Sequence, residues 1–292
     1  MTPAFKQFRT GIIDYAGMFP PAALDAGTAL KNYRAYLGTE FRWMLNNFIL
    51  PVSKLSLTEP ADDLSLSVII KDPVSEDEKK MLSQWAPRIQ ALETVLPEKP
   101  DTPSEVAACL EDFRAQAAGA GRAGIFVETT GPERFSTVIE VLARINRSSS
   151  GGRFGFKLRC GGADKAAVPS PERVAAVIAS CRDHDIPLKF TAGLHHPFFG
   201  FSESLGTVRH GFINIFSAAL LAFSCSLCKE EIRACLTDGN KKSFVFSGTG
   251  FSWQGRSVGI DAIERLRREK VIGFGSCSFE EPLADLVSLK LL

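Results

Sequence analysis

Short runs rich in β-branched and aromatic residues alternate along the chain with longer segments that carry apolar residues at helical spacing. This alternation is typical of a parallel sheet whose strands are joined by helical crossovers. Eight runs are predicted to be strands, which is the number that closes a (β/α)8 barrel. They span residues 11–15, 47–51, 66–70, 91–95, 124–128, 154–159, 187–191 and 271–276.

The length of the chain also fits one barrel. A chain of 292 residues can hold one large α/β domain or two smaller ones, and no shift in composition marks a boundary. We therefore predict an α/β fold of the (β/α)8 TIM-barrel type, as a single domain over residues 1–292. Because hydrophobic periodicity does not separate a closed barrel from an open doubly wound sheet, the open sheet stays an alternative.

Three connections differ from the rest. Residues 192–210 form a long connection, which predicts a lid or a binding segment. Residues 238–255 contain two aromatic runs around a Ser-Gly-Thr-Gly turn, which predicts a hairpin inserted before the last strand. The serine- and glycine-rich residues 148–152 are predicted to be an ordinary loop.

Helix starts are recognisable at several points. Ser75, Ser104 and Ser170 precede acidic or proline-containing segments, and we predict them as helix N-caps. Residues 170–183 carry an apolar stripe that suits one face of a sheet. The uncharged segment 212–228 contains an asparagine and serines, so we predict a buried helix rather than a membrane span.

Charge and cysteine content limit the class of protein. Lys and Arg number 34 against 33 Asp and Glu, which leaves a formal net charge of +1 and no basic excess for a nucleic acid. The opening residues lack the apolar run of a secretory signal, and the seven cysteines are scattered. We therefore expect a cytoplasmic protein with reduced thiols.

Charged residues occur inside two neighbouring predicted strands. Successive side chains of a strand point to opposite faces, so the apolar residues of 154–159 place Lys157 and Arg159 inside the barrel. The same alternation in the next strand places Lys189 and Thr191 inside. Because catalytic groups of such barrels lie at the C-terminal ends of the strands, we expect these residues at the mouth.

Two lysines this close suggest either covalent chemistry or a charge network. Neighbouring ammonium groups lower each other's pKa, and a neutral lysine can form a Schiff base with a carbonyl substrate. The alternative is that both lysines pair with nearby carboxylates. The candidate carboxylates at or near predicted strand ends are Asp14, Glu93 and Glu128.

The segments around these lysines resemble a known family. The sequences Phe-Lys-Leu-Arg-Cys-Gly-Gly at 156–162 and Leu-Lys-Phe-Thr-Ala-Gly-Leu at 188–194 look like strands six and seven of deoxyribose-phosphate aldolase and its class I relatives. The resemblance implies that Lys157 forms the Schiff base and that Lys189 tunes its pKa. Residues 273–278 resemble the family's last strand, which implies that Ser276 and Ser278 hold a substrate phosphate.

The resemblance covers the opening Ile-Asp-Tyr segment and roughly residues 152–280, and the chain departs from it in places. Arg159 and Cys160 replace the small hydroxyl residues that usually follow the Schiff-base lysine. The insertion before the last strand has no counterpart, and Glu93 is a candidate for the family's acid on strand four. Arg159 could instead bind a carboxylate or phosphate through its two-pronged guanidinium group.

The remaining candidates are two histidines and three cysteines, and their spacing indicates which roles they suit. Adjacent His195 and His196 do not suit a zinc site, whereas His195 suits general acid/base catalysis. The pair Cys225 and Cys228 is predicted to be core thiols, and Cys277 a packed small residue rather than a reactive thiol.

We therefore predict an aldolase-like lyase that forms a lysine Schiff base with a small anionic carbonyl substrate. A non-covalent isomerase, dehydratase or hydrolase on the same barrel is one alternative, and a non-catalytic small-molecule-binding barrel is another. No cofactor or metal is expected, nor is a nucleic-acid or membrane partner, and formation of a homo-oligomer stays open. The candidate catalytic residues are Lys157, Lys189, Asp14, Glu128 and His195, and the candidate substrate-binding residues are Arg159, Thr191, Ser276 and Ser278.

Overall fold

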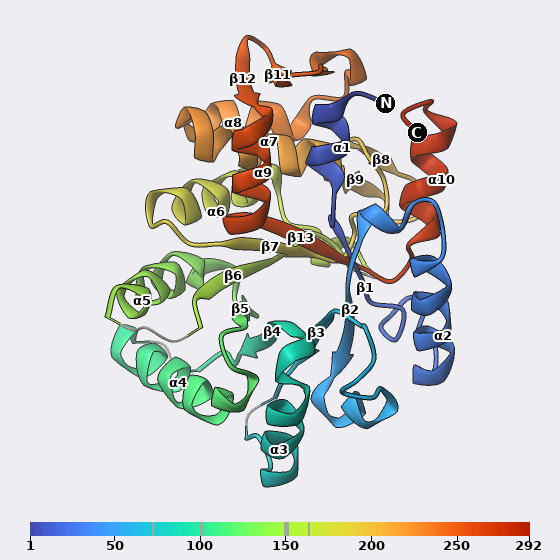
Figure 1. Ribbon diagram of the computed structural model, residues 1–292. Coiled ribbons are helices and arrows are strands. Elements are labelled where there is room, and N and C mark those ends of the chain that lie inside the picture. Colours follow the sequence, from blue (N-terminus) through green and yellow to red (C-terminus); the bar gives the residue numbers. More distant parts are fainter. Residues whose placement is uncertain (72, 100–101, 149–151, 163) are drawn as a thin grey trace.

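The computed structural model describes residues 1–71, 73–99, 102–148, 152–162 and 164–292. Within them, eight parallel strands close into a barrel in the order β1-β13-β7-β6-β5-β4-β3-β2 (Figure 1). All eight predicted strands are present, so the (β/α)8 barrel is confirmed and the open-sheet alternative is wrong. The barrel strands are β1 (Ile13–Tyr15), β2 (Leu45–Pro51), β3 (Leu66–Ile69), β4 (Ile89–Leu96), β5 (Gly124–Thr129), β6 (Phe154–Arg159), β7 (Leu188–Thr191) and β13 (Val271–Ser276).

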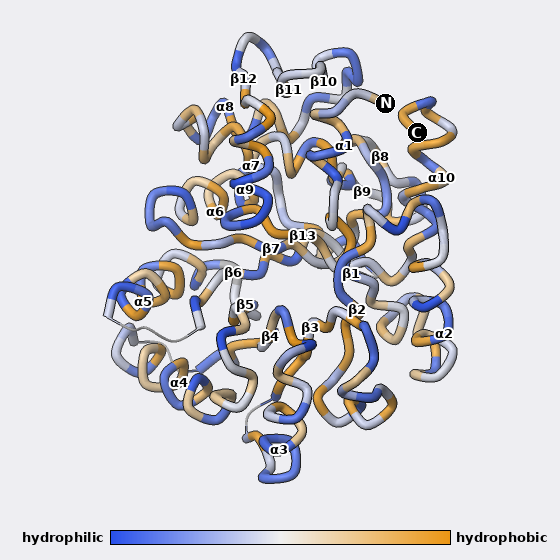
Figure 2. The backbone as a smooth tube through the Cα atoms, in the orientation of Figure 1, coloured by the Kyte–Doolittle hydropathy of each residue, from blue (hydrophilic) through white to orange (hydrophobic). Residues whose placement is uncertain are grey.

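Helices surround the barrel and cover its outer face (Figure 1). Figure 2 shows hydrophobic and hydrophilic residues alternating along these helices, as expected for elements with one face on the barrel and one in water. The helices are α1 (Pro3–Arg9), α2 (Ala26–Leu37), α3 (Glu76–Trp85), α4 (Pro103–Gln116), α5 (Phe135–Ser148), α6 (Pro171–Asp183), α7 (Phe212–Cys225), α8 (Lys229–Thr237), α9 (Ile260–Glu269) and α10 (Glu280–Ser288).

Two of the three predicted helix N-caps are confirmed. Ser75 and Ser170 accept hydrogen bonds from backbone N–H groups of the first turns of α3 and α6. The third prediction is wrong, because α4 starts at Pro103 and its N-cap is Thr102 rather than Ser104. Proline suits the first helical position since it lacks the N–H that would be unpaired there. Thr102 and Glu105 then complete a capping box.

The two long connections contain strands of their own. Residues 192–210 include the hairpin β8 (Gly200–Ser202) and β9 (Thr207–Arg209), which the sequence reading did not predict. The predicted hairpin before the last barrel strand is present as β10 (Phe244–Phe246) and β11 (Gly250–Trp253), and β12 (Arg256–Gly259) extends it to a three-stranded antiparallel sheet. Of the predicted loop at 148–152, residues 149–151 lie outside the described residues.

The long uncharged segment forms the buried helix that was predicted, but it ends early. Helix α7 is buried along most of its length and ends at Cys225. Cys225 is only half-buried and Cys228 is exposed, so the prediction of two core thiols is wrong. None of the helices in the described residues has the length and apolar character that crossing a membrane requires.

Candidate active site

The pairing of β6 with β7 sets the two lysines side by side. Lys157 is the register partner of Lys189, and Arg159 is the partner of Thr191. The alternate residues of both strands are buried in the apolar core, as the sequence pattern predicts. The two lysine side chains therefore share the inside of the barrel with carboxylates from strands β1, β4 and β5.

Lys189 occupies the deepest position and is surrounded by acceptors. Its Nζ lies 2.6 Å from Asp14 Oδ2, contacts Glu93 Oε1, and donates to Ser67 Oγ over 3.1 Å. Its side chain is only 1% exposed and that of Asp14 is fully buried. Three bonds to the other carboxylate oxygen of Asp14, from the Asn46 side chain and from the backbone and side chain of Asn47, fix Asp14 in place.

Lys157 lies nearer the opening and shares its acidic partner with Lys189. Its Nζ is 2.7 Å from Glu93 Oε2 and 3.2 Å from Glu128 Oε2. Glu93 therefore uses one oxygen for each lysine. The Lys157 side chain is 9% exposed, so it is the one of the two lysines that reaches toward solvent.

Arg159 stands at the mouth of the barrel. Its Nε donates to Glu128 Oε1 over 2.7 Å, and its side chain is 51% exposed. Exposure thus rises in order from Lys189 through Lys157 to Arg159. Six side chains form this series, which we call the charge ladder: Asp14, Glu93, Glu128, Lys157, Arg159 and Lys189.

The charge ladder decides between two expectations from the sequence. The alternative pairing of both lysines with carboxylates is present, and three carboxylates balance three cations. Burial would lower the pKa of Lys189, but the charges of Asp14 and Glu93 outweigh it and raise that pKa above its ordinary value. The expectation that the two ammonium groups lower each other's pKa is therefore wrong for Lys189, because a carboxylate lies between them.

The same contacts act on Glu93. Burial would raise the pKa of this carboxyl, yet the charges and hydrogen bonds of Lys157 and Lys189 hold it well below its ordinary range. Glu93 therefore stays ionised across the physiological range and holds both lysines.

Several polar residues around Lys189 are not among the site residues predicted from the sequence. Ser67 donates to Glu93 Oε1 over 2.7 Å, and its polar side chain within the apolar run of β3 is the signal that could have marked it. Asn46 and Asn47 show a similar signal in β2. The ring of Phe126 lies 5.6 Å from Lys189 Nζ, and a Cβ at Gly155 would come within 2.6 Å of that ring, so a glycine is required there.

The predicted phosphate-binding serines form bonds within their own loop. Ser276 Oγ donates to the backbone oxygen of Ser278 over 2.6 Å, and Ser278 Oγ accepts from the backbone N–H of Glu281. Thr191 is partly buried between Arg159 and Gly275, which are its register partners on β6 and β13.

His195 lies on the α10 side of the mouth. Its Nδ1 is 2.7 Å from Glu281 Oε2, and its Nε2 is 4.0 Å from the sulfur of Cys277. Burial raises the pKa of the Cys277 thiol, which agrees with a packed rather than a reactive cysteine. His196 turns to Asp285, and within the described residues no group of three His, Cys, Asp or Glu side chains is arranged to hold a metal ion.

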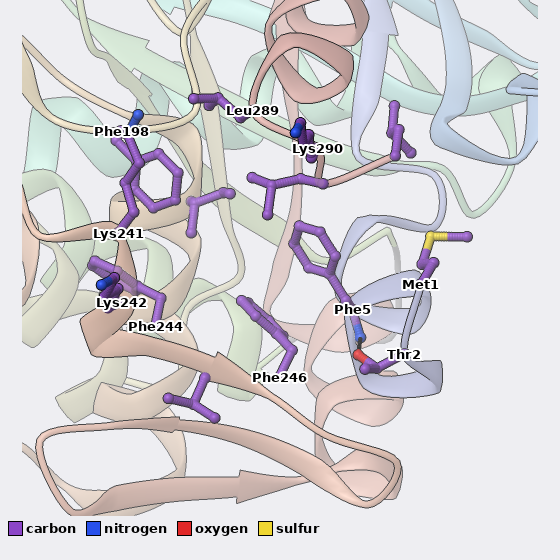
Figure 3. Close-up of a pocket in the computed structure, with 14 residues that line it drawn as sticks. Met1, Thr2, Phe5, Phe198, Lys241, Lys242, Phe244, Phe246, Leu289 and Lys290 are labelled. Atoms are coloured by element: carbon purple, nitrogen blue, oxygen red, sulfur yellow. Dashed lines mark hydrogen bonds between the residues drawn. The ribbon is translucent and has the colours of Figure 1, made fainter.

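A cavity of about 580 Å³ lies apart from the charge ladder, none of whose residues lines it. It is bounded by α1, β10 and residues 289–292. Figure 3 shows the rings of Phe5, Phe198, Phe244 and Phe246 in its wall. Its lining is mainly apolar and holds no paired acid and base, so the candidate chemistry belongs to the barrel interior.

Comparisons with known proteins add one distant similarity. No protein-family model matches the chain, and no curated protein sequence matches it. Among solved structures, a chain titled "QR15, an Aldolase" is similar at 10% sequence identity, with 100% of this chain and 99% of that chain covered and a TM-score of 0.38. The chain is thus distantly similar to a protein described as an aldolase, and at this TM-score its own strand order and site geometry carry the argument.

Proposed function

We propose that the protein is an aldolase-like lyase that forms a Schiff base between Lys157 and a small carbonyl substrate. The observation that carries the proposal is the difference in exposure between the two lysines. Lys189 is sealed at 1% exposure, whereas Lys157, at 9%, lies below the opening beside Glu128 and Arg159. A substrate that enters the mouth therefore reaches Lys157 before Lys189.

The surroundings of each lysine support different roles. Lys189 has two carboxylates and a hydroxyl as acceptors and a raised pKa, so it keeps its proton and acts as a fixed positive charge. Each carboxylate beside Lys157 also holds a second cation, Lys189 for Glu93 and Arg159 for Glu128. Lys157 therefore shares both of its carboxylates with another cation and is also the more exposed lysine, which supports its role as the nucleophile.

The proposed reaction follows from these positions. Glu128 first takes one proton from Lys157 Nζ, which then attacks the carbonyl carbon. The carbonyl oxygen leaves as water with a second proton from Nζ and the proton that Glu128 returns, which gives an iminium ion. The carbon–carbon bond then breaks, its electrons pass into the iminium to form an enamine, and Glu128 takes the hydroxyl proton of the departing fragment. Asp14 positions Lys189, and His195 serves as an acid/base on the opposite side of the mouth.

Reductive trapping tests the proposal. Borohydride is added with each of a panel of aldehydes, ketones and oxo acids, and the modified lysine is located by peptide mass spectrometry. We expect a reduced adduct on Lys157 in the wild-type protein and none at that position in Lys157→Arg. The exposed Lys165→Arg variant is the matched control and should keep the adduct on Lys157. If no carbonyl in the panel modifies Lys157, the proposal is wrong.

A second candidate function is a non-covalent isomerase, dehydratase or hydrolase in which the charge ladder stabilises charge and moves protons. The observation that favours it is the contact of Lys157 with two carboxylates, which is also what an electrostatic role requires. Turnover that survives in Lys157→Arg, together with no reduced adduct, would support this function over the aldolase.

A further inference from the structure

The guanidinium group of Arg159 lies at the mouth of the barrel. Its Nε is hydrogen-bonded to Glu128, and its two terminal nitrogens take no part in that bond. Glu128 is 8% exposed in its side chain and accepts the Nε–H of Arg159, which fixes the plane of the guanidinium. Among the residues that the structure describes, neither terminal nitrogen of Arg159 has a hydrogen-bond partner, and the side chain is half exposed. Two parallel N–H donors on a fixed plane match the two oxygens of a carboxylate.

The other candidate site for an anion is already filled by the protein's own groups. The hydroxyls of Ser276 and Ser278 are bonded within their loop. The next helix, α10, opens with Glu280 and Glu281, which match the positive end of that helix with negative charge. Because these negative charges offset the positive end of α10, its start is a weaker site for a phosphate dianion than a helix start without acidic residues.

The spacing between the amine and the guanidinium sets where the substrate's anion must be. Lys157 and Arg159 are two positions apart on β6 and contact the two oxygens of one carboxylate, that of Glu128. Residues two positions apart on an extended strand have Cα atoms about 7 Å apart and side chains on the same face. A short substrate whose anion lies next to its carbonyl group is therefore the smallest one that the amine and the guanidinium could hold together beside this shared carboxylate.

We propose that the substrate class is a 2-oxo acid, whose carbonyl carbon bonds to Lys157 and whose carboxylate lies on the two terminal nitrogens of Arg159. This inference rests on the proposed Schiff-base function. The bond that breaks lies between carbons 3 and 4, its electrons form the enamine, and the proton of the carbon-4 hydroxyl goes to Glu128. Carbon 3 then takes a proton from solvent, and water hydrolyses the iminium to release a shorter 2-oxo acid beside the aldehyde.

The test compares carbonyl compounds that differ in their anionic group. Pyruvate, methyl pyruvate, acetaldehyde and glyceraldehyde 3-phosphate are each titrated with borohydride, and the concentration that half-saturates trapping on Lys157 is measured. We expect pyruvate to trap at a concentration about tenfold to a hundredfold below that of methyl pyruvate, as for a charge-assisted hydrogen-bonded pair. The ketone of methyl pyruvate is at least as electrophilic as that of pyruvate. Tighter trapping of pyruvate would therefore report its carboxylate and not the reactivity of its ketone.

Variants of Arg159 and of Arg153, which directly precedes β6, assign the effect. The readout is the ratio of the half-saturating concentration of methyl pyruvate to that of pyruvate, because any effect on Lys157 through Glu128 applies to both compounds. Arg159→Gln should lower this ratio about tenfold. Arg153→Gln, just before the start of β6 where Arg153 pairs with Asp185, should leave the ratio unchanged. A thermal melt of each variant verifies folding, and the wild-type comparison of substrates decides the matter if a variant does not fold.

The outcomes separate the two proposals. Three results would overturn the 2-oxo acid and still leave Lys157 as the Schiff-base residue. They are equal trapping of pyruvate and methyl pyruvate, stronger trapping of the phosphorylated aldehyde, and the same ratio between methyl pyruvate and pyruvate in Arg159→Gln as in the wild type. Absence of any adduct on Lys157 would overturn the Schiff base itself and this inference with it.

Discussion

Glu93 binds both interior lysines at once, one with each carboxylate oxygen, in a part of the barrel from which water is almost excluded. Placing such charges in the interior costs desolvation, and a buried ion network is seldom more stable than apolar residues of the same volume. Removal of one member is strongly destabilising because it leaves a charge without a partner. The six buried or partly buried charges of the charge ladder therefore make it a candidate functional site, as the proposed function requires.

The pH dependence of unfolding should report the charge of Glu93. Its folded pKa is lowered from the ordinary value of 4.5, so the folded state releases this proton more readily than the unfolded state. The stability that Glu93 contributes is therefore fully present above pH 4.5 and is lost as the pH falls below it. We expect the free energy of unfolding of the wild type to drop with acid more steeply than that of Glu93→Gln, by up to about 1.4 kcal/mol per pH unit.

Urea unfolding at closely spaced pH values between 3 and 7 measures both slopes. Glu76→Gln is the control, because Lys79 lowers the pKa of Glu76 in an exposed pair that solvent screens, and its slope should stay near that of the wild type. If the free energy of unfolding falls equally with pH in Glu93→Gln and in the wild type, the two lysines do not lower the pKa of Glu93. Lys189 has the opposite sign, since its raised pKa makes its contribution disappear only above pH 10.5.

For single residues, the sequence predicts the face of a strand on which a side chain lies better than it predicts the partners of that side chain. The alternation of apolar and charged residues placed Lys157, Arg159 and Lys189 inside the barrel, because it reports the face of each side chain. It could not show that Glu93 reaches both lysines, since that contact depends on distances across the closed barrel. The predicted effect of one ammonium on the other was wrong for Lys189 for the same reason.

Among the elements, the barrel strands were predictable and the short outer strands were not. Each barrel strand is an apolar run between turn signals, which is a strong pattern even over a few residues. Strands β8, β9 and β12 have three or four residues, many of them polar and partly exposed, and arise from pairing within a connection. The start of α4 differs from the prediction because Thr102 and Pro103 together specify an N-cap two residues before Ser104.

The side chain of Asn214 in helix α7 forms hydrogen bonds with three other segments of the chain. Asn214 is fully buried; its Oδ1 accepts from the backbone N–H of Phe199, and its Nδ2 donates to the backbone oxygens of Cys235 and Asp238. These partners lie in the connection after β7, in α8 and at the start of the inserted sheet. One asparagine in a mostly apolar helix therefore fixes where both insertions leave the barrel.

Asn214→Ala should destabilise the protein by about 1–3 kcal/mol, because one buried and two partly buried backbone groups lose their partner. The exposed Asn240→Ala variant is the control, and water can replace its bonds, so a much smaller effect is expected. The midpoint of urea unfolding compares the two. Similar small effects at both positions would mean that α7 does not hold the insertions through Asn214.

For the molecule as a whole, closure of the barrel depends on the pairing of the first strand with the last. Strand β1 has three residues and pairs with β13 over Ile13–Phe274, Asp14–Gly275 and Tyr15–Ser276. The same pairing brings Asp14 under Lys189, so the charge ladder is complete only in the closed barrel. Below this seam lies Arg267 of α9, buried beneath the N-terminal ends of both strands.

Arg267 joins the two sides of the seam through backbone oxygens. It donates to Phe8 over 3.0 Å and to Thr10 and Gly11 over 3.3 Å on the side of β1. On the side of β13 its guanidinium donates to Val271 and Ile272. The planar group with five donors suits this arrangement of acceptors, and the single ammonium of a lysine does not.

We therefore expect Arg267→Met to destabilise the protein by about 3–5 kcal/mol, since carbonyl groups on both sides of the seam lose a charged donor in a buried place. Its neighbour Arg268 is 67% exposed, so Arg268→Met is a matched control that should unfold at nearly the wild-type urea concentration. Native-state hydrogen exchange locates the effect: protection should fall first in β1 and β13 and remain in β4 and β5, on the opposite side of the barrel. A uniform loss of protection would show that Arg267 supports the whole core rather than the seam, and no loss at all would show that the strand pairs close the barrel without it.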